Sequence, residues 1–188
     1  MKRVKRIICT LCILFPVLLF SICGVLLIGT TGDSDGGDPK HASGLGLSDK
    51  VREYAAFVGD TAAEYNIHEY EKYLLAIMMV ETGGEGDDPM QSLGNSGLTE
   101  EEKTPSESIK AAVAYFAMLL QKADTLGCDL DTVIQAYNYG TGYIDYVSVR
   151  GKAHTFQLSC DFASSKCGGR KVKYDNPVAI AQNGGWRY

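Results

Sequence analysis

The sequence has little of what marks a metal enzyme, a nucleotide-binding protein or a nucleic-acid-binding protein. Its three histidines, His41, His68 and His154, lack zinc-ligand spacing with another His or Cys. The Gly-Gly pair at 168–169 has no strand-to-helix context that would make a phosphate-binding loop. Apart from four basic residues at the N-terminus, 14 basic residues stand against 23 acidic ones, so no basic surface is available for phosphates. We therefore expect no metal, no cofactor and no nucleic-acid partner.

Alternating strand patterns are also scarce, with one weak example in "RKVKY" at 170–174. Helical periodicity is frequent instead, and good capping residues precede several of the runs. The sequence therefore predicts a mostly α single domain with one core. The expected helices run from a Ser48 cap through 49–67, over 69–80, from a Thr104 cap with Pro105 first to Gly127, from Asp129 or Asp131 to Gly140, and over 143–149.

Charge is missing altogether from residues 7–28, a run of 22 residues that follows a basic cluster. A helix of roughly 20 apolar residues spans a bilayer, and the basic end stays in the cytoplasm. We expect a single-pass anchor in the cell membrane and an extracytoplasmic domain. A cleaved signal peptide is the alternative, because residues 29–32 are small. The predicted parts are 1–28, a basic stem and transmembrane signal-anchor; 29–47, a flexible linker rich in Gly, Ser and Asp; and 48–188, the folded domain.

Cysteine is sparse outside the apolar run. Cys160 and Cys167 lie in a polar segment, and outside the cell they could bridge a short loop, which would leave Cys128 over. The spacing alone leaves this disulfide open.

A glutamate stands where the apolar run of the second helix meets a glycine-rich stretch, in "MMVETGGEGDDPMQS". On a helix Glu81 lies above Ile77 and on the side of Leu74, so its carboxyl emerges at the edge of an apolar stripe. It also sits at the helix C-terminus, which disfavours negative charge. Both effects raise the pKa of Glu81, and a protonated carboxyl can serve as a general acid towards a glycosidic oxygen. The alternative is a solvated glutamate that closes a helix.

A second group of candidate residues lies in "QAYNYGTGYIDYV". Tyr137 and Tyr143 offer flat faces and hydroxyls, and Asn138 can orient a water or an acetamido group. Such a surface suits sugar rings. The alternative is an aromatic core stripe, to which Tyr115, Phe116, Tyr139 and Tyr146 could belong.

Together the two stretches resemble the lysozyme-like domain of CwlT-type cell-wall hydrolases, within the goose-type lysozyme and soluble lytic transglycosylase superfamily. Three blocks resemble that family in order: "AIMMVETGG", with Thr82 where the family has serine, "DDPMQS", and "VIQAYNYGTGYIDYV". The basic stem and membrane segment are similar too. The resemblance covers about residues 48–188.

This resemblance implies a muramidase that cleaves the β-1,4 bond between N-acetylmuramic acid and N-acetylglucosamine in peptidoglycan. Glu81 would be the general acid/base and Asp88 a second carboxylate. The saccharide would contact Thr82, Gln91, Tyr137, Asn138 and Tyr143. Relatives often belong to conjugative elements of Gram-positive bacteria, so secretion-channel proteins are possible partners.

The chain departs from the family pattern in two places. "MQSLGNSG" replaces the usual Met-Gln-Ser-Ser-Glu-Ser, and the chain stops at "NGGWRY", where the family continues into a tyrosine-rich helix. From the second departure we infer a possible C-terminal truncation. Many relatives carry a second, peptidase domain, which we do not expect here, so we predict glycan cleavage without peptide cleavage. Two alternatives stay open: a lytic transglycosylase that makes 1,6-anhydromuramic ends, and a non-catalytic wall-binding subunit of a secretion channel.

Overall fold

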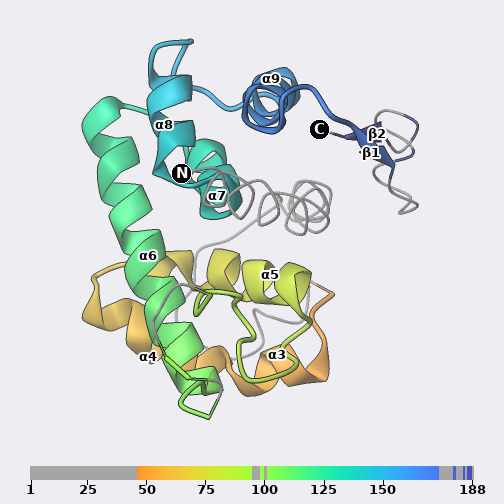
Figure 1. Ribbon diagram of the computed structural model, residues 1–188. Coiled ribbons are helices and arrows are strands. Elements are labelled where there is room, and N and C mark those ends of the chain that lie inside the picture. The colour runs from red at the N-terminus through yellow and green to blue at the C-terminus, as the bar shows by residue number, and fades with distance from the viewer. Residues whose placement is uncertain are drawn as a thin grey trace. The chain divides into compact units, whose positions relative to one another are not determined.

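Helices dominate the computed structural model, which describes residues 46–94, 98–99, 101–173, 180, 184 and 186–187 (Figure 1). The predicted membrane anchor and nearly all of the predicted linker lie outside these residues. Within them, no helix combines the length and the apolar character that a membrane span requires. By their internal packing the described residues divide between Met118 and Leu119 into two units, and each is described by itself.

The first unit is built from four helical segments and the start of a fifth. They are α3 (Asp49–Glu53), α4 (Ala55–Glu64), the 3₁₀ helix η2 (His68–Tyr70), α5 (Glu71–Glu81) and the beginning of α6 (Pro105–Leu126).

Ser48 caps α3 as predicted, because its side chain accepts a hydrogen bond from the backbone N–H of Val51. The predicted single helix over 49–67 is wrong in one respect: it breaks at Tyr54, which ends α3 and precedes α4.

α5 supplies the centre of the first unit's core. Leu74, Ile77 and Met78 are fully buried, and α3 and α4 both pack against this helix. Its apolar residues therefore fix the direction in which the helix ends, which is at Glu81. The prediction placed this helix at 69–80, so its end is correct to one residue.

α6 begins and ends where its sequence predicts. The Thr104 hydroxyl accepts a hydrogen bond from the N–H of Glu107 (3.2 Å), and the helix ends before Gly127, whose φ of +71° lies in the left-handed region. The Glu107 carboxylate contacts Lys110 (3.2 Å), an exposed pair along the helix. Along one face the helix buries Ile109, Ala112, Val113, Phe116 and Leu119.

The second unit continues from the last part of α6. It contains α7 (Leu130–Tyr139), α8 (Thr141–Ser148), α9 (Phe156–Cys167) and a short antiparallel pair, β1 (Val172–Lys173) with β2 (Trp186–Arg187). α7 packs on α8, and α8 on α9.

α7 begins at an Asp129 cap, one of the two predicted starts, and ends at Gly140 as predicted. The sequence did not predict α9. This helix is polar along most of its length and buries Ser159 and Phe162, so its apolar periodicity is weak.

The two cysteines considered for a disulfide both lie on α9, seven residues apart. A rise of about 1.5 Å per residue separates their Cα atoms by roughly 10 Å, beyond the reach of a disulfide. The Cys167 thiol instead contacts the carbonyl oxygens of Ser164 (3.7 Å) and Arg170 (3.3 Å). The possible bridge between Cys160 and Cys167 is therefore wrong for this fold.

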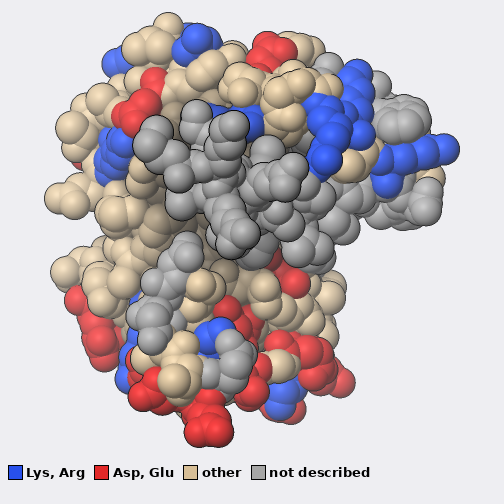
Figure 2. Space-filling model, in the orientation of Figure 1, with Lys and Arg blue, Asp and Glu red and all other residues tan. Residues whose placement is uncertain are grey.

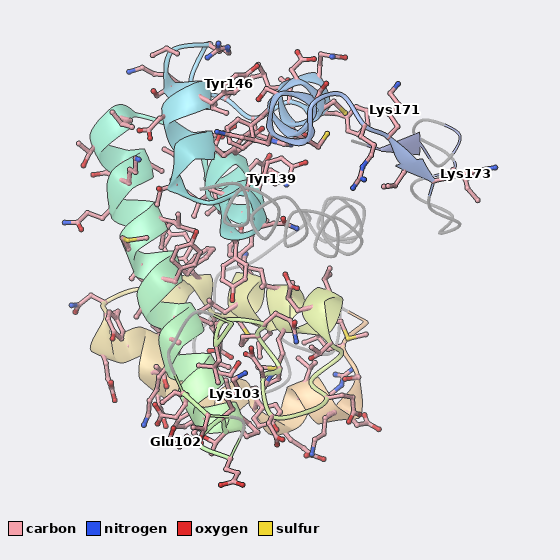
Figure 3. The ribbon with its side chains drawn as sticks, viewed as in Figure 1. Glu102, Lys103, Tyr139, Tyr146, Lys171 and Lys173 are labelled. Atoms are coloured by element: carbon pink, nitrogen blue, oxygen red, sulfur yellow. The ribbon has the colours of Figure 1, made fainter. Side chains whose placement is uncertain are left out.

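The two units carry different charge. Residues 46–118 contain 14 acidic and five basic residues, whereas residues 119–188 contain six acidic and eight basic ones. On the face shown in Figure 2, red side chains gather over α3, α4 and the start of α6. In the second unit Lys171 precedes β1 and Lys173 is its last residue (Figure 3).

Candidate active site

Glu81 is the last residue of α5 and is almost wholly buried, with 9% of its surface exposed. Its Oε1 atom is buried and has no hydrogen-bond partner among the described residues. A buried carboxyl oxygen without a partner costs stability, so such groups are rare in folded proteins. Among the described residues, Oε1 of Glu81 therefore remains available to accept a hydrogen bond or, when it is protonated, to donate one.

The pKa of Glu81 is raised from its ordinary value to about 7. Burial is the larger cause, because it removes the water that would stabilise the carboxylate. The negative charge of Asp88 is the second cause. The sequence also predicted a raised pKa for Glu81. The apolar stripe on which that prediction rests is the buried face of α5. Near neutral pH this carboxyl therefore exists in both its protonated and ionised forms.

The loop after Glu81 is held by Thr82. The Thr82 hydroxyl donates to the carbonyl oxygen of Pro89 (2.9 Å) and accepts from the N–H of Gly84 (3.1 Å). The first contact ties the residue next to Glu81 to the residue next to Asp88, and the second closes the turn at Gly84. Thr82 was predicted to contact saccharide, and in the structure its hydroxyl organises the loop.

Gly84 has to be a glycine where it stands. Its φ is +89°, and a Cβ atom there would lie 3.0 Å from the backbone nitrogen of Val51. The loop therefore presses directly on the first turn of α3. Ser48 adds a further contact, since its hydroxyl donates to the carbonyl oxygen of Gly83 (2.7 Å).

The carboxylate of Asp88 accepts three hydrogen bonds. Oδ1 accepts from the N–H of Ser92 (2.9 Å) and the hydroxyl of Ser108 (2.6 Å), and Oδ2 accepts from the N–H of Leu93 (3.0 Å). Charge-assisted bonds of this kind order the turn that follows. The turn carries Gln91, which is exposed, has a left-handed φ of +50° and donates from Nε2 to the carbonyl oxygen of Asp88 (3.1 Å).

The sequence reasoning missed Ser108. It is fully buried, at the fourth residue of α6, on the face that also buries Ile109 and Ala112. A small polar residue on the apolar face of an amphipathic helix was the available signal, because a buried hydroxyl needs partners. Those partners come from residues 88–92, which sequence spacing alone does not place next to α6.

The other three predicted site residues lie in the second unit. Tyr137 on α7 is buried (8% exposed) and Asn138 is half-buried. Tyr143 on α8 is fully buried, and its hydroxyl is hydrogen-bonded to Nδ1 of His154 (2.7 Å). The seven predicted residues thus divide between the units, with Glu81, Thr82, Asp88 and Gln91 in the first.

The aromatic residues of the second unit form a cluster, defined by Tyr139, Tyr143, Tyr146 and Phe162. Ring centroids of Tyr143 lie 5.3 Å from Tyr139 and 5.2 Å from Phe162, both edge to face. Figure 3 shows Tyr139 on α7 and Tyr146 on α8. The core-stripe alternative describes how these tyrosines pack, and the saccharide contacts of Tyr137, Asn138 and Tyr143 stay predictions.

The described residues thus form a mostly helical fold in which Glu81 is buried at a helix end. The Lysozyme-like family profile matches residues 48–188, and the chain belongs to this family. The resemblance to a CwlT-like lysozyme domain is thereby confirmed.

Three relatives from Gram-positive bacteria are similar to the chain. It is 32% identical over 139 residues to the uncharacterised membrane protein YocA of Bacillus subtilis, covering 69% of this chain and 62% of that protein. It is 29% identical over 168 residues to the bifunctional muramidase/DL-endopeptidase CwlT of the same organism, covering 85% of this chain and 50% of CwlT. It is 29% identical to pneumococcal vaccine antigen A of Streptococcus pneumoniae, covering 70% and 68%.

One solved structure is also similar, that of a protein described as similar to lipoprotein, NLP/P60 family, from Staphylococcus aureus. The TM-score is 0.72 and the identity 45%, covering 76% of this chain and 48% of that one. The chain thus spans about half to three fifths of the length of YocA, CwlT and this structure.

Proposed function

We propose that the chain is a peptidoglycan hydrolase that cleaves the β-1,4 bond between N-acetylmuramic acid and N-acetylglucosamine, with Glu81 as the general acid/base. The observation that carries the proposal is the Glu81 carboxyl, which is buried, lacks a hydrogen-bond partner at Oε1 among the described residues, and has a pKa of about 7. A carboxyl in this state can hold a proton for a glycosidic oxygen. Membership of the Lysozyme-like family and the similarity to CwlT, a named muramidase, support it.

The chemistry needs one proton to be given and one to be taken. Protonated Glu81 donates to the bridging oxygen as the bond to the muramic acid C1 breaks, and N-acetylglucosamine leaves with a free hydroxyl. Ionised Glu81 then accepts a proton from the water that attacks C1, which restores the protonated carboxyl. A pKa near 7 suits both steps, because the protonated carboxyl can donate its proton and the ionised carboxyl can accept one near neutral pH.

A lytic transglycosylase is the second candidate. The Asp88 carboxylate already accepts three hydrogen bonds, which favours a mechanism in which Glu81 is the single proton-transferring carboxyl. The attacking group would then be the C6 hydroxyl of muramic acid, which closes an anhydro ring, instead of water. The residues are the same in both reactions and the products differ.

The proposed setting is the outer face of the cell membrane. The uncharged run at residues 7–28 and the name of YocA, a membrane protein, support this placement. Remodelling of the wall for conjugative transfer, with secretion-channel proteins as partners, is part of the same proposal and rests on the family resemblance alone.

Mass spectrometry of the products from purified peptidoglycan tests the function. The full chain in mild detergent should release fragments with a reducing muramic acid, whereas anhydro ends would establish the transglycosylase. Glu81→Gln should lower the rate at least about 100-fold, since general acid catalysis contributes typically 10²–10⁴-fold. Glu85→Gln is the matched control, because Glu85 is an exposed glutamate of the same loop. No fragments from folded protein would favour a non-catalytic wall-binding role.

A further inference from the structure

The two chain neighbours of Gln91 are both bonded to the same serine of α6. The backbone N–H of Met90 donates to the hydroxyl of Ser108 (3.0 Å), and the hydroxyl of Ser92 donates to the carbonyl oxygen of Ser108 (2.7 Å). Ser108 and Met90 are fully buried, whereas Gln91 is exposed. Gln91 therefore stands at the tip of a turn that is fixed to α6 on both sides.

The side chain of Gln91 is held by its own turn. Its backbone N–H (3.0 Å) and its Nε2 atom (3.1 Å) both donate to the carbonyl oxygen of Asp88. A carbonyl oxygen can only accept, so the amide nitrogen of Gln91 faces the turn and Oε1 is the atom left over. Among the described residues Oε1 of Gln91 has no hydrogen-bond partner. It is therefore an exposed acceptor whose position depends on the shape of the turn.

That shape is one that the backbone does not favour by itself. Gln91 has a φ of +50°, in the left-handed region that a side chain disfavours. Such conformations persist where surrounding contacts hold them, and they gather at functional sites. The Ser108 hydroxyl supplies two of these contacts, because it also donates to Oδ1 of Asp88 (2.6 Å), the residue that begins the turn. One hydroxyl thus holds positions 88 and 90 together.

The same turn is linked to the loop that follows Glu81. The hydroxyl of Thr82 donates to the carbonyl oxygen of Pro89 (2.9 Å), between the two positions that Ser108 holds. The turn is therefore fixed to α6 through Ser108 and to the end of α5 through Thr82. Both contacts lie within the first unit, so the place of Gln91 relative to Glu81 is set inside this unit.

We propose that Ser108 is a positioning residue for glycan binding: it holds the turn in the shape that presents Oε1 of Gln91, as a hydrogen-bond acceptor, to a hydroxyl or amide N–H of the saccharide. The inference rests on the proposed function, since it requires a glycan ligand. Ser108 is buried and acts only through Gln91. It adds a residue from α6 to a site whose predicted residues in the first unit all lie between 81 and 91.

The test compares kcat and KM for glycan strands freed of their stem peptides, with the full chain in mild detergent. In Ser108→Ala the turn loses the hydroxyl that holds positions 88 and 90. We expect KM to rise about 3- to 10-fold, the effect of one lost polar contact, while kcat stays within about twofold. Ser159→Ala is the matched control and should leave KM unchanged. Ser159 is equally buried, on α9, and its hydroxyl donates to the carbonyl oxygen of Phe156 (2.9 Å).

A double variant separates a positioning role from a merely structural one. Gln91→Gly removes the acceptor and should raise KM by itself. If Ser108 acts through Gln91, adding Ser108→Ala to Gln91→Gly should change KM by less than about twofold, because the contact is already gone. Effects that multiply in the double variant overturn the inference. An unchanged KM in Gln91→Gly overturns it as well.

Ser108→Cys guards against an alanine variant that does not fold. A thiol keeps the shape and is a weaker donor and acceptor, so KM should lie between the values of the unchanged protein and Ser108→Ala, or rise moderately where the alanine variant is lost. An unchanged KM in folded Ser108→Ala or Ser108→Cys overturns the inference. So does a fall in kcat with KM unchanged, which would place the role of Ser108 in the chemical step.

Calorimetry with the same glycan strands distinguishes this inference from the proposed function. If the unchanged chain cleaves no glycan, the proposed function fails, and the Kd values of the same four proteins are compared in place of KM. A weaker Kd in each single variant, with no further weakening in the double variant, keeps the positioning role of Ser108. Additive changes, equal Kd values or no binding at all overturn it.

Discussion

Two carboxyl groups, one in each unit, are placed in opposite ways. In the first unit Glu81 is buried at the end of α5, and its Oε1 has no partner among the described residues. In the second unit Asp129 caps α7 by accepting from the N–H of Thr132 (3.0 Å), and it also accepts from the N–H of His154 (3.0 Å to Oδ2). Asp129 thus holds two segments together, whereas Oε1 of Glu81 makes no such link among the described residues.

The contrast separates groups that stabilise the fold from a group that costs stability. A satisfied carboxylate contributes to folding, and an unsatisfied buried one opposes it. Buried groups that oppose folding are retained where chemistry needs them, which is why strongly shifted pKa values cluster at functional sites. The second unit has its own buried titratable group, Tyr143, but its hydroxyl is paired with His154. This criterion supports the proposal that Glu81 carries the chemistry.

The largest expected effect is on how stability depends on pH. The pKa of Glu81 is about 7 in the fold and near 4.5 when unfolded, so the folded state keeps a proton that the unfolded state releases. Stability is therefore greatest below about pH 4.5 and is lost as pH rises through 7, by up to about 3 kcal/mol from this group. In Glu81→Gln this loss should vanish, as measured by chemical denaturation from pH 4.5 to 8.

The exposed Glu85 supplies the control for that comparison. Glu85→Gln should follow the unchanged protein at every pH. Parallel curves of unfolding free energy against pH for Glu81→Gln and the unchanged protein would mean that Glu81 is not protonated in the fold. That result would contradict the stated difference between Glu81 and Asp129.

A smaller effect on stability is expected when Asp129, the other carboxylate of the comparison, is replaced. Asp129→Ala removes the cap of α7 and the acceptor for His154, and should lower stability by about 2 kcal/mol. Turnover measured well below the melting temperature should stay the same, because Asp129 is a structural group. Asp124→Ala, which changes an exposed aspartate of α6, should leave the melting temperature unaltered. A loss of turnover in folded Asp129→Ala would contradict the assignment.

The smallest effect concerns two residues with left-handed backbone, one in each unit. Gln91 has φ +50° and Lys152 has φ +65°, a region that glycine adopts without strain. Gln91→Gly and Lys152→Gly should each raise stability by a few tenths to about 1 kcal/mol. If Gln91 contacts saccharide, Gln91→Gly alone should also raise KM. Equal KM values in the two variants would remove Gln91 from the proposed contacts.

The parts of the fold that sequence could predict are those determined by neighbours in the chain. Ser48, Thr104 and Asp129 cap helices through residues only three positions away, and Gly127 and Gly140 end helices by their own backbone freedom. α9 was missed because it buries too little apolar surface to leave a periodic pattern.

The candidate site shows the same difference between features set by neighbours in the chain and features set by long-range packing. The raised pKa of Glu81 follows mainly from the apolar run in which it stands, so it could be anticipated. The partners of Asp88 could not, because Ser108 lies 20 residues further along the chain and meets it only through packing. Long-range polar contacts of this kind depend on which faces of two elements meet, and periodicity leaves that undetermined.

Ser48 has a consequence for where a shortened form of the protein can begin. It is the N-cap of α3, the first helix of the described residues. Its hydroxyl also donates to the carbonyl oxygen of Gly83, two residues beyond Glu81. This hydroxyl therefore links the start of α3 to the loop that follows Glu81. A shortened form of the protein that starts after Ser48 would lose both the buried Leu47 side chain and the hydrogen bond that holds this loop against α3, so its first residue should lie before Leu47.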